Sequence, residues 1–235
     1  MPKQKLTTVF LLLTIVFGVS AQVKFNNFDE NNQRHGPWKK YYDGTKLVRY
    51  EGTFSHGEEV GTFKFYKKLG KINYLAATKE FNEDGTVQVI YYSLGKKVIS
   101  EGKMVGEKLI GNWLYYHKDS DQVMTSETYD EQGILHGVKQ IYYPHGQLTQ
   151  EVNYVHGKRE NIELYYAENG TIIKKYHYEN DQLHGLATHF NDRGDKILEG
   201  TYKRDKRTGL WKWYQNGRVV KEKDYTYIPK FKKKQ

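Results

Sequence analysis

The chain lacks cysteine altogether, so its 235 residues can form no disulfide, no cysteine nucleophile and no zinc–thiolate site. No serine lies in a G-x-S-x-G elbow. The sequence also contains neither a G-x-x-x-x-G-K-[ST] phosphate loop nor an H-E-x-x-H zinc helix. With no catalytic constellation in the sequence, we expect a protein that is not an enzyme and that has no cofactor and no metal.

Long apolar runs are scarce as well. The run from Val9 to Val19 is too short to span a bilayer comfortably. Lys3 and Lys5 precede it, and Val19-Ser20-Ala21 supplies the small residues that signal peptidase requires. We therefore expect residues 1–21 to be a secretory signal peptide, with an uncleaved anchor as the alternative. Because no cysteine is available for lipid attachment, the exported chain is expected to be soluble or peripheral, in the periplasm or outside the cell.

What the sequence does contain is a block, a small residue followed by an aromatic strand, that recurs about every 25 residues. It reads GPWKKYY at residues 36–42 and GLWKWY at residues 209–214. In the third and sixth units, Gln88 and Glu163 stand where tryptophan is expected. A fixed period of this length indicates a repeat architecture. Eight units begin at Gly36, Gly61, Thr86, Gly111, Gly137, Asn161, Gly185 and Gly209.

Each unit continues through a glycine turn into a second extended stretch, such as residues 148–154, which is the pattern of a β-hairpin. Sustained helical spacing of apolar residues is absent after the leader. An isolated hairpin is marginal in water, so the units must stack. We predict an all-β, elongated, twisted antiparallel sheet of about sixteen strands, a solenoid or meander of stacked hairpins, over residues 36–225. Residues 22–35 would cap it and residues 226–235 would form a basic tail.

Histidine precedes glycine at six positions, where it could ligate a metal, act as a general base or simply serve turn geometry. Because the pairs recur with the repeat, we expect successive histidines to lie along one sheet edge without converging, and therefore to serve the turns. The six are His35, His56, His136, His145, His156 and His184.

Glutamate recurs too, at Glu51, Glu101, Glu151 and Glu199. Two facing carboxylates could perform acid–base chemistry. One glutamate per unit instead favours a column that pairs with lysines on neighbouring strands. Lysines in suitable places are Lys39, Lys64 and Lys212.

The repeat aromatics have two interpretations. They pack within and between hairpins, or part of one face stays open as a groove lined by tyrosine and tryptophan, a composition enriched at protein interfaces and sugar platforms. The candidate binding residues are Trp38, Tyr42, Phe63, Trp113, Tyr116, Tyr143, Trp211 and Trp213.

Charge adds a weaker signal. The formal net charge is +9, and it falls to +7 without the leader, which holds Lys3 and Lys5 and no acid. Part of the excess lies in a cluster of lysines between residues 230 and 234, which is typical of a solvated tail. Contact with anionic lipid through this tail is an alternative. We expect no nucleic-acid partner, because such binding requires basic residues clustered on one face and an exported protein seldom meets that ligand.

The pattern G-x-W-x-x-Y-Y, a turn glycine, a strand with leucine and glutamate, and a second turn glycine resembles the MORN-repeat variant. It is the form found in bacterial proteins labelled YwqK-type antitoxins. The resemblance implies one hairpin per repeat in an elongated sheet and a non-enzymatic interaction scaffold. It also implies that contact with phospholipid and homodimer formation occur among such proteins.

Together these features predict a secreted, non-enzymatic repeat scaffold of the bacterial cell envelope that binds another protein along its sheet, in an immunity (antitoxin-like) or adaptor role. The alternative is a carbohydrate or wall-polymer binding module, because Gly-Trp-Tyr-Tyr repeats also resemble choline- and glucan-binding modules. Peripheral binding of anionic lipid is a third option. Exposed strand edges would allow homo-oligomers, and the sequence does not identify the partner.

Overall fold

The computed structural model describes residues 24–226, and this part of the chain is a single sheet of 18 strands without helices. No apolar helix of membrane-spanning length occurs in it. The strands are β1 (Asn27–Phe28), β2 (Arg34–Tyr41), β3 (Val48–Ser55), β4 (Glu58–Leu69), β5 (Ile72–Phe81), β6 (Val87–Tyr92), β7 (Val98–Val105), β8 (Lys108–Tyr116), β9 (Val123–Tyr129), β10 (Gly137–Tyr142), β11 (Leu148–Val155), β12 (Lys158–Tyr166), β13 (Ile172–Glu179), β14 (Gln182–Leu183), β15 (Gly185–Phe190), β16 (Lys196–Lys203), β17 (Lys206–Gln215) and β18 (Arg218–Asp224).

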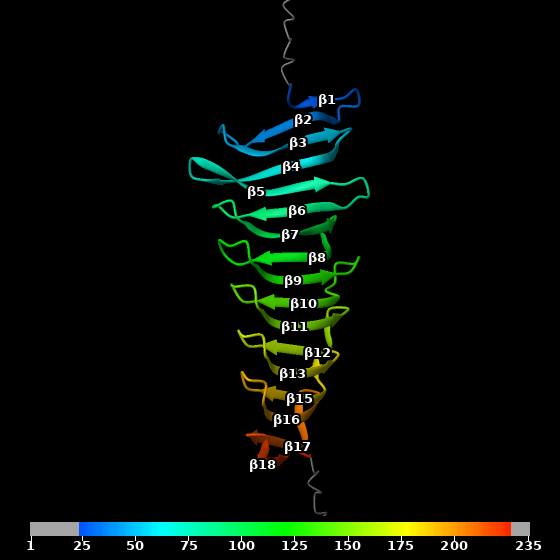
Figure 1. Cartoon of the computed structure of the whole chain (residues 1–235). Helices are drawn as coiled ribbons and strands as arrows, with labels where there is room; N and C mark the ends of the chain where they lie inside the picture. The colour runs from blue at the N-terminus through cyan, green and yellow to red at the C-terminus, as the bar shows by residue number, and fades with distance from the viewer. Residues whose placement is uncertain (1–23, 227–235) are drawn as a thin grey trace, which may run out of the picture.

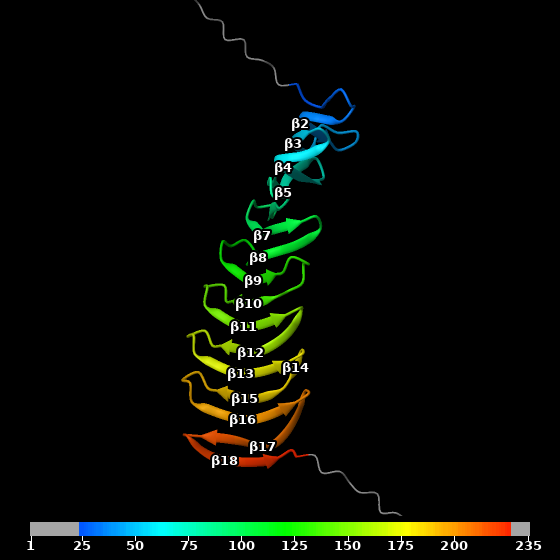
Figure 2. The same cartoon turned by 90° about the vertical axis from the view of Figure 1, so that its right-hand side faces the viewer.

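The strands follow one another through space in chain order, and paired neighbours are antiparallel (Figure 1). The short β14 and the following β15 both pair with β13. They stack like the rungs of a ladder, with the first strand at one end and the last at the other, and the ladder turns along its length (Figure 2). Sixteen strands form the eight expected hairpins, and β1 and β14 are two-residue additions. The predicted all-β hairpin meander is confirmed.

Local chemistry places the turns at the two margins of the sheet. The β3–β4 turn is His56-Gly57, with φ of 47° and 88°, and the β17–β18 turn is Asn216-Gly217, with φ of 50° and 73°. Two consecutive positive φ angles give the turn twist that matches a twisted hairpin, and His, Asn and Gly accept them best. Four of the five-residue turns instead begin with Asn or Asp, at Asp29, Asn82, Asp130 and Asn191. In one of them Asn191 Oδ1 accepts hydrogen bonds from the backbone N–H groups of Arg193 and Asp195.

Large rings packed against glycine form the core on one face of the sheet, which we call the ring face. Trp113 of β8 is 2% exposed and lies against Gly102 of β7, where an added methyl group would come within 2.4 Å of the indole Cδ2. Phe63 and Trp211 pack in the same way on the glycines of their neighbouring strands, Gly52 and Gly200. A single-layer sheet buries these rings because the partner strand has no side chain at that point.

Two units adapt this arrangement. In the sixth unit Glu163 occupies the ring position and is 2% exposed, and Val152 replaces the glycine opposite it. In the third unit the sequence analysis placed Gln88 at the ring position, which is wrong by one residue. Val89, which is fully buried and lies opposite Gly102, occupies the ring position, whereas Gln88 lies on the other face. The strand alternation decides this, because β6 keeps Val89 and Tyr91 on the ring face.

Glu51, Glu101 and Glu199 lie on the opposite face, and each accepts a hydrogen bond from a tyrosine 15 residues later. Tyr66 donates to Glu51 at 2.7 Å, and Glu51 also pairs with Lys39 at 2.9 Å, as the sequence predicted. The same tyrosine–glutamate bond recurs between Tyr116 and Glu101. The glutamates of alternate units thus form a structural column, and none of the four lies opposite another acid in the strand register.

A third pair, Tyr214 and Glu199, repeats the bond at 3.4 Å, and Glu199 takes its cation from Lys196 at 2.6 Å. Lys212, which the sequence predicted as a glutamate partner, lies 3.8 Å from Glu222. The lysine partner therefore differs between units, and the tyrosine partner is shared by three of the four glutamates. The fourth, Glu151, accepts instead from Gln140 Nε2 at 2.8 Å.

These bonds shift the acid–base behaviour of both partners. Burial, followed by the hydrogen bond to Glu51, raises the pKa of Tyr66 to about 12. The hydrogen bond from Tyr66, followed by that from Lys39, lowers the pKa of the Glu51 carboxyl. Folding therefore favours the protonated phenol and the ionised carboxylate.

Replacing Gly102 by alanine should destabilise the sheet by about 1–3 kcal/mol, because the new methyl group displaces the Trp113 indole. Urea denaturation of the chain without its leader measures the loss. The control is Gly95→Ala in an exposed turn, where φ is not positive and the nearest atom to the new methyl group is Ser93 Oγ at 3.7 Å. That change should stay within about 0.5 kcal/mol of wild type. Equal effects of the two substitutions would show that ring-on-glycine packing is unimportant.

Stability should fall as pH rises from about 10 to about 12, because the unfolded chain loses the Tyr66 proton at about 10 and the folded chain holds it until about 12. Urea midpoints measured at intervals across this range test it. Tyr66→Phe should reduce the slope, and the control Tyr41→Phe, which removes an exposed ring hydroxyl, should leave it unchanged. An identical slope in all three proteins would contradict the linkage.

Candidate functional site

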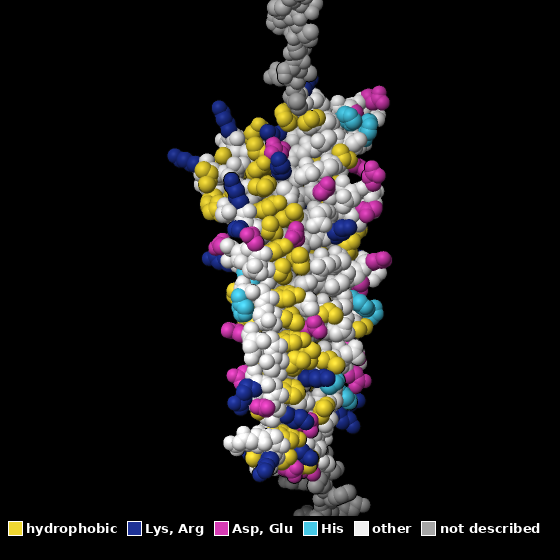
Figure 3. Space-filling model, viewed as in Figure 1, with side chains coloured by type: hydrophobic (Ala, Val, Ile, Leu, Met, Phe, Trp, Pro, Cys, Tyr) yellow, Lys and Arg dark blue, Asp and Glu magenta, His cyan; other side chains and the backbone are white. Residues whose placement is uncertain are grey.

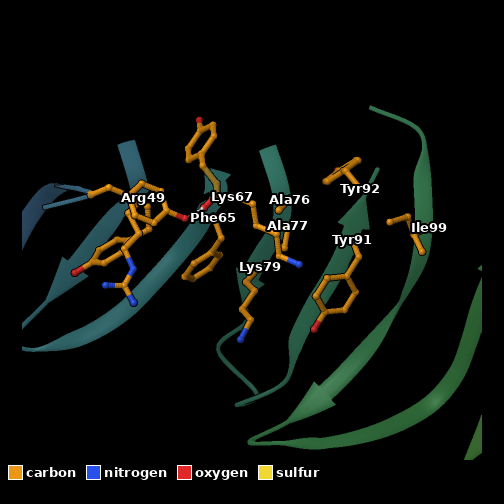
Figure 4. A pocket seen from close by; sticks show the side chains of 12 residues that line it. Arg49, Phe65, Lys67, Ala76, Ala77, Lys79, Tyr91, Tyr92 and Ile99 are labelled. Atoms are coloured by element: carbon orange, nitrogen blue, oxygen red, sulfur yellow. Dashed lines mark hydrogen bonds between the residues drawn. The ribbon is translucent and has the colours of Figure 1, made fainter. Parts of the chain in front are cut away.

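An open groove of about 540 Å³ crosses the ring face over strands β3 to β7 (Figure 4). Side chains from all five strands and from the turn after β2 contribute to it. The groove is lined by Tyr42, Arg49, Tyr50, Phe65, Tyr66, Lys67, Ala76, Ala77, Lys79, Tyr91, Tyr92 and Ile99.

The groove exists because β5 supplies alanine where its neighbours supply rings. Ala77 lies directly between Phe65 of β4 and Tyr91 of β6 in the sheet register. Because the Ala77 methyl group is small and the strands on both sides carry rings, a gap as wide as one strand is left between the rings. Phe65 and Tyr91 point to the same side of the sheet and form the two walls (Figure 4).

Packing outside the groove holds its aromatic wall in place. The Phe65 ring lies 6.1 Å from the buried Phe63 ring and 6.2 Å from the Tyr50 ring, measured between centroids. Tyr42, at the rim, donates its hydroxyl to the Tyr66 carbonyl at 2.7 Å. The wall therefore needs little reordering when it binds a ligand, which lowers the entropic cost of binding.

The charge of the lining is one-sided. Arg49, Lys67 and Lys79 border the groove, and no aspartate or glutamate is among its lining residues. Lys79 Nζ lies 5.6 Å from the centroid of the Phe65 ring, so the cation and the aromatic wall are adjacent. Apolar walls beside three cations suit a ligand that combines flat or apolar groups with negative charge.

Three of the binding residues predicted from the sequence lie inside the packed core. Phe63 and Trp211 are 0% exposed and Trp113 is 2% exposed, so these rings have no surface to offer a ligand and serve to hold strands together. Tyr116 is engaged on the opposite face by Glu101. Trp38 packs between Phe28 and Phe54, and its indole N–H donates to the Asn27 carbonyl at 3.1 Å.

The remaining three lie nearer the surface and far apart along the sheet. Tyr42 lines the groove. Tyr143 stacks on His145 with ring centroids 5.5 Å apart, and Trp213 lies under the Lys221 ammonium at 5.1 Å. The sheet therefore does not bring the predicted set together, and ligand binding by its surface members remains a prediction.

Five main residues of the groove were not among the eight candidate binding residues predicted from the sequence. They are Arg49, Phe65, Ala77, Lys79 and Tyr91. Arg49 sits at an irregularity in the register of β3, where the strand pairing with β2 skips a residue. The dipeptide Ala76-Ala77 was the available signal, since it interrupts a strand that is otherwise rich in larger residues.

The histidines depart from expectation at two places. The rings of His35 and His56 lie 4.7 Å apart, and those of His136 and His156 lie 5.1 Å apart, so histidines of successive same-side turns do converge. The expectation that they would only line the edge is wrong at these four positions. The cause is that a turn on this margin stacks on the strand start beside it, because the Gly57 N–H donates to the carbonyl of Arg34, the first residue of β2, at 2.9 Å.

Comparison with known proteins gives one sequence family. Residues 135–156 and 159–180 match the MORN repeat variant. These two stretches cover β10–β13 and their turns, and repeats of this kind generally serve as scaffolds that bind proteins or lipids and suggest a non-enzymatic protein. The predicted MORN-type repeat is thus confirmed for this stretch, and the YwqK-type antitoxin label remains a prediction. No curated protein matches the chain at a significant level.

Among solved structures, one similar chain is the Staphylococcus aureus TarM mutant in complex with fondaparinux, alpha-GlcNAc-glycerol and UDP. The TM-score is 0.33 at 12% identity, and the match covers 52% of this chain and 21% of that one. The likeness is too slight to inform fold or function.

The groove should bind a small anionic aromatic molecule such as anilinonaphthalene sulfonate, because its sulfonate meets Arg49 and Lys79 while its rings meet the aromatic walls. Dye fluorescence titrated with the chain measures this binding. Ala77→Phe should fill the gap and weaken binding at least tenfold, and the control Lys118→Ala, an exposed cation in the β8–β9 turn, should not change it. If filling the gap leaves the titration unchanged, the dye binds elsewhere.

Proposed function

We propose that the protein is an exported, non-enzymatic scaffold that holds an acidic segment of a partner protein in the groove between β4 and β6. The observation that carries the proposal is the gap at Ala77, walled by Phe65 and Tyr91 and bordered by three cations with no acid among the lining residues. Aromatic walls supply contact area at low entropic cost, and cations select a negatively charged segment.

The shape of the groove supports a chain segment better than a compact small molecule. It is open to solvent, lies on one face of a single-layer sheet and runs across five strands (Figure 4). An extended peptide could lay an apolar or aromatic side chain over Ala77 while its carboxylates meet Arg49 and Lys79. The repeat family supports a scaffold role of this kind.

The setting proposed for this scaffold is the bacterial cell envelope, in the periplasm or at the outer surface. The lysines, apolar run and small residues of positions 1–21 support export, and these residues lie outside those that the structure describes. An immunity role, in which the scaffold masks a secreted toxin, fits a non-catalytic exported binder. The basic tail at residues 230–234 also lies outside the described range, so lipid contact rests on sequence alone.

Carbohydrate binding is the second candidate, and one observation favours it. Phe65 and Tyr91 face a gap of one strand width, and rings in such positions stack well on sugar faces. The three cations would then select an acidic polymer over a neutral one. A preference for negative charge therefore does not distinguish protein binding from carbohydrate binding. Identifying the bound partner does.

The test is affinity capture with the chain lacking residues 1–21 as bait in envelope extract, followed by mass spectrometry. A protein partner should be retained by wild type and by the control Lys118→Ala, and lost with Ala77→Phe and with the double variant Arg49→Ala, Lys79→Ala. Direct titration of the purified partner should then show at least a tenfold loss of affinity for each groove variant. Urea midpoints close to wild type would show that the variants are folded.

Two outcomes would contradict the proposal. The first is a partner that the groove variants retain with unchanged affinity, which would place binding elsewhere on the sheet. The second is capture of no protein together with groove-dependent binding to an acidic glycan array, which would establish the carbohydrate candidate instead.

A further inference from the structure

Two clusters of one aspartate and two histidines lie on the same margin of the sheet. The first consists of Asp29, His35 and His56, from the turn between β1 and β2, the start of β2 and the turn between β3 and β4. One ligand atom from each residue lies within 4.8 Å of the other two. Histidine side chains are visible along the right-hand margin of the space-filling view (Figure 3).

The second cluster repeats the first four units later along the chain. Asp130, His136 and His156 come from the turn between β9 and β10, the start of β10 and the turn between β11 and β12. The three ligand atoms again lie within 4.8 Å of one another. In both clusters the backbone N–H of the second histidine approaches Nδ1 of the first at 3.4 Å, so the two arrangements share one geometry.

The backbone positions each carboxylate before any ligand binds. Asp29 Oδ1 accepts the N–H groups of Asn31 and Gln33, both at 2.9 Å, which leaves Oδ2 facing His56 Nδ1 at 2.8 Å. Backbone donors thereby fix one carboxylate oxygen and aim the other at the imidazole. Such preorganisation is what a metal site requires of its supporting groups.

The second carboxylate is anchored in the same manner. Asp130 Oδ1 accepts the N–H groups of Gln132 at 3.0 Å and Ile134 at 2.9 Å. Its Oδ2 lies 3.9 Å from His156 Nδ1, beyond hydrogen-bond distance. A direct carboxylate–imidazole bond is therefore not the feature that both clusters share, whereas the convergence of three ligand atoms is.

The fold itself does not require these residues. The turn that begins at Asn82, between β5 and β6, closes with the same N–H to carbonyl bond as the turns that begin at Asp29 and Asp130. At that level Thr86 precedes Val87, which pairs with Met104 as Gly36 pairs with Phe54, so Thr86 and Gly106 take the places of the two histidines. The same turns thus form without any ligating trio.

We propose that the two clusters are binding sites for a divalent transition-metal ion of the Zn²⁺ type, one ion per cluster. Two imidazoles and one carboxylate are a ligand set that such ions prefer, with bonds of about 2.0–2.2 Å. Small rotamer changes bring ligand atoms within 4.8 Å to that geometry, since the histidine side chains lie at the surface. The fourth position faces solvent and would take water. The bound ion would tie each turn to the next turn on the same margin.

The test is titration of the chain lacking residues 1–21, free of any affinity tag, with Zn²⁺ by calorimetry and with Co²⁺ by visible absorption. Wild type should bind two ions per chain. His56→Asn and His156→Asn should each bind one, and the double variant none. Asparagine suits these positions because φ is 47° at His56 and 48° at His156. The control is His145→Asn, which removes a histidine before glycine outside both clusters and should leave two sites.

Thermal unfolding supplies a second measurement that does not depend on stoichiometry. Zn²⁺ should raise the melting temperature of wild type and of His145→Asn, and should not change that of the double variant. Circular dichroism of the apo double variant should match apo wild type, because the turns remain. Binding of two ions by the double variant, absence of binding by wild type, or loss of both ions in either single variant would overturn the two-site proposal.

Discussion

A ring packed against glycine on the neighbouring strand is the interaction on which this sheet depends. A single layer has no second sheet or helix to cover its apolar side chains, so it must bury them within its own thickness. Because Gly102 has no side chain, the Trp113 indole lies flat on the backbone of β7 and is only 2% exposed. Burial of a side chain of this size contributes about 1.5–3 kcal/mol. This ring-on-glycine contact recurs along the sheet and stabilises a chain that has no cysteine and so can form no disulfide.

The same dipeptide serves both faces of the sheet. In Glu101-Gly102 the glycine receives a ring on one face, and the glutamate accepts a tyrosine hydroxyl on the other. Strand alternation makes this possible, because adjacent residues point to opposite sides. The candidate binding groove arises at Ala77, a small residue between two rings on the ring face. Small residues recur between rings along this row, since Ser100 lies between Tyr91 and Tyr115.

The sequence predicted the architecture well because the period, the turn glycines and the aromatic strands are all local signals. Eight hairpins and the glutamate–lysine pair at Glu51 and Lys39 followed from them. The shifted register in the third unit was missed, because Val89 is neither aromatic nor marked by a neighbouring glycine. The groove was missed because it depends on what lies across the strand from Ala77, which is a non-local property.

The histidine clusters were missed for a different physical reason. Linear spacing places His35 and His56 21 residues apart, and the repeat suggests a regular row. The structure stacks the start of β2, which holds His35, against the β3–β4 turn, which holds His56, so the two rings lie 4.7 Å apart. Only the aspartate turn that precedes each pair, with its backbone-anchored carboxylate, completes a trio. Sequence spacing alone does not reveal which turns share a margin.

The ring-on-glycine contact also bears on how such a gene could gain or lose units. Trp113 belongs to the fourth unit, but Gly102, on which it rests, belongs to the third. An in-frame deletion of the fourth unit would bring Lys139 opposite Gly102 and leave an unfilled space under the sheet. We therefore expect a deletion or duplication to preserve the packing only where the ring residue of one unit fits the residue opposite it in the unit before. Val152 of the fifth unit and Glu163 of the sixth form such a matched pair. Replacing only one of these two units would separate the pair.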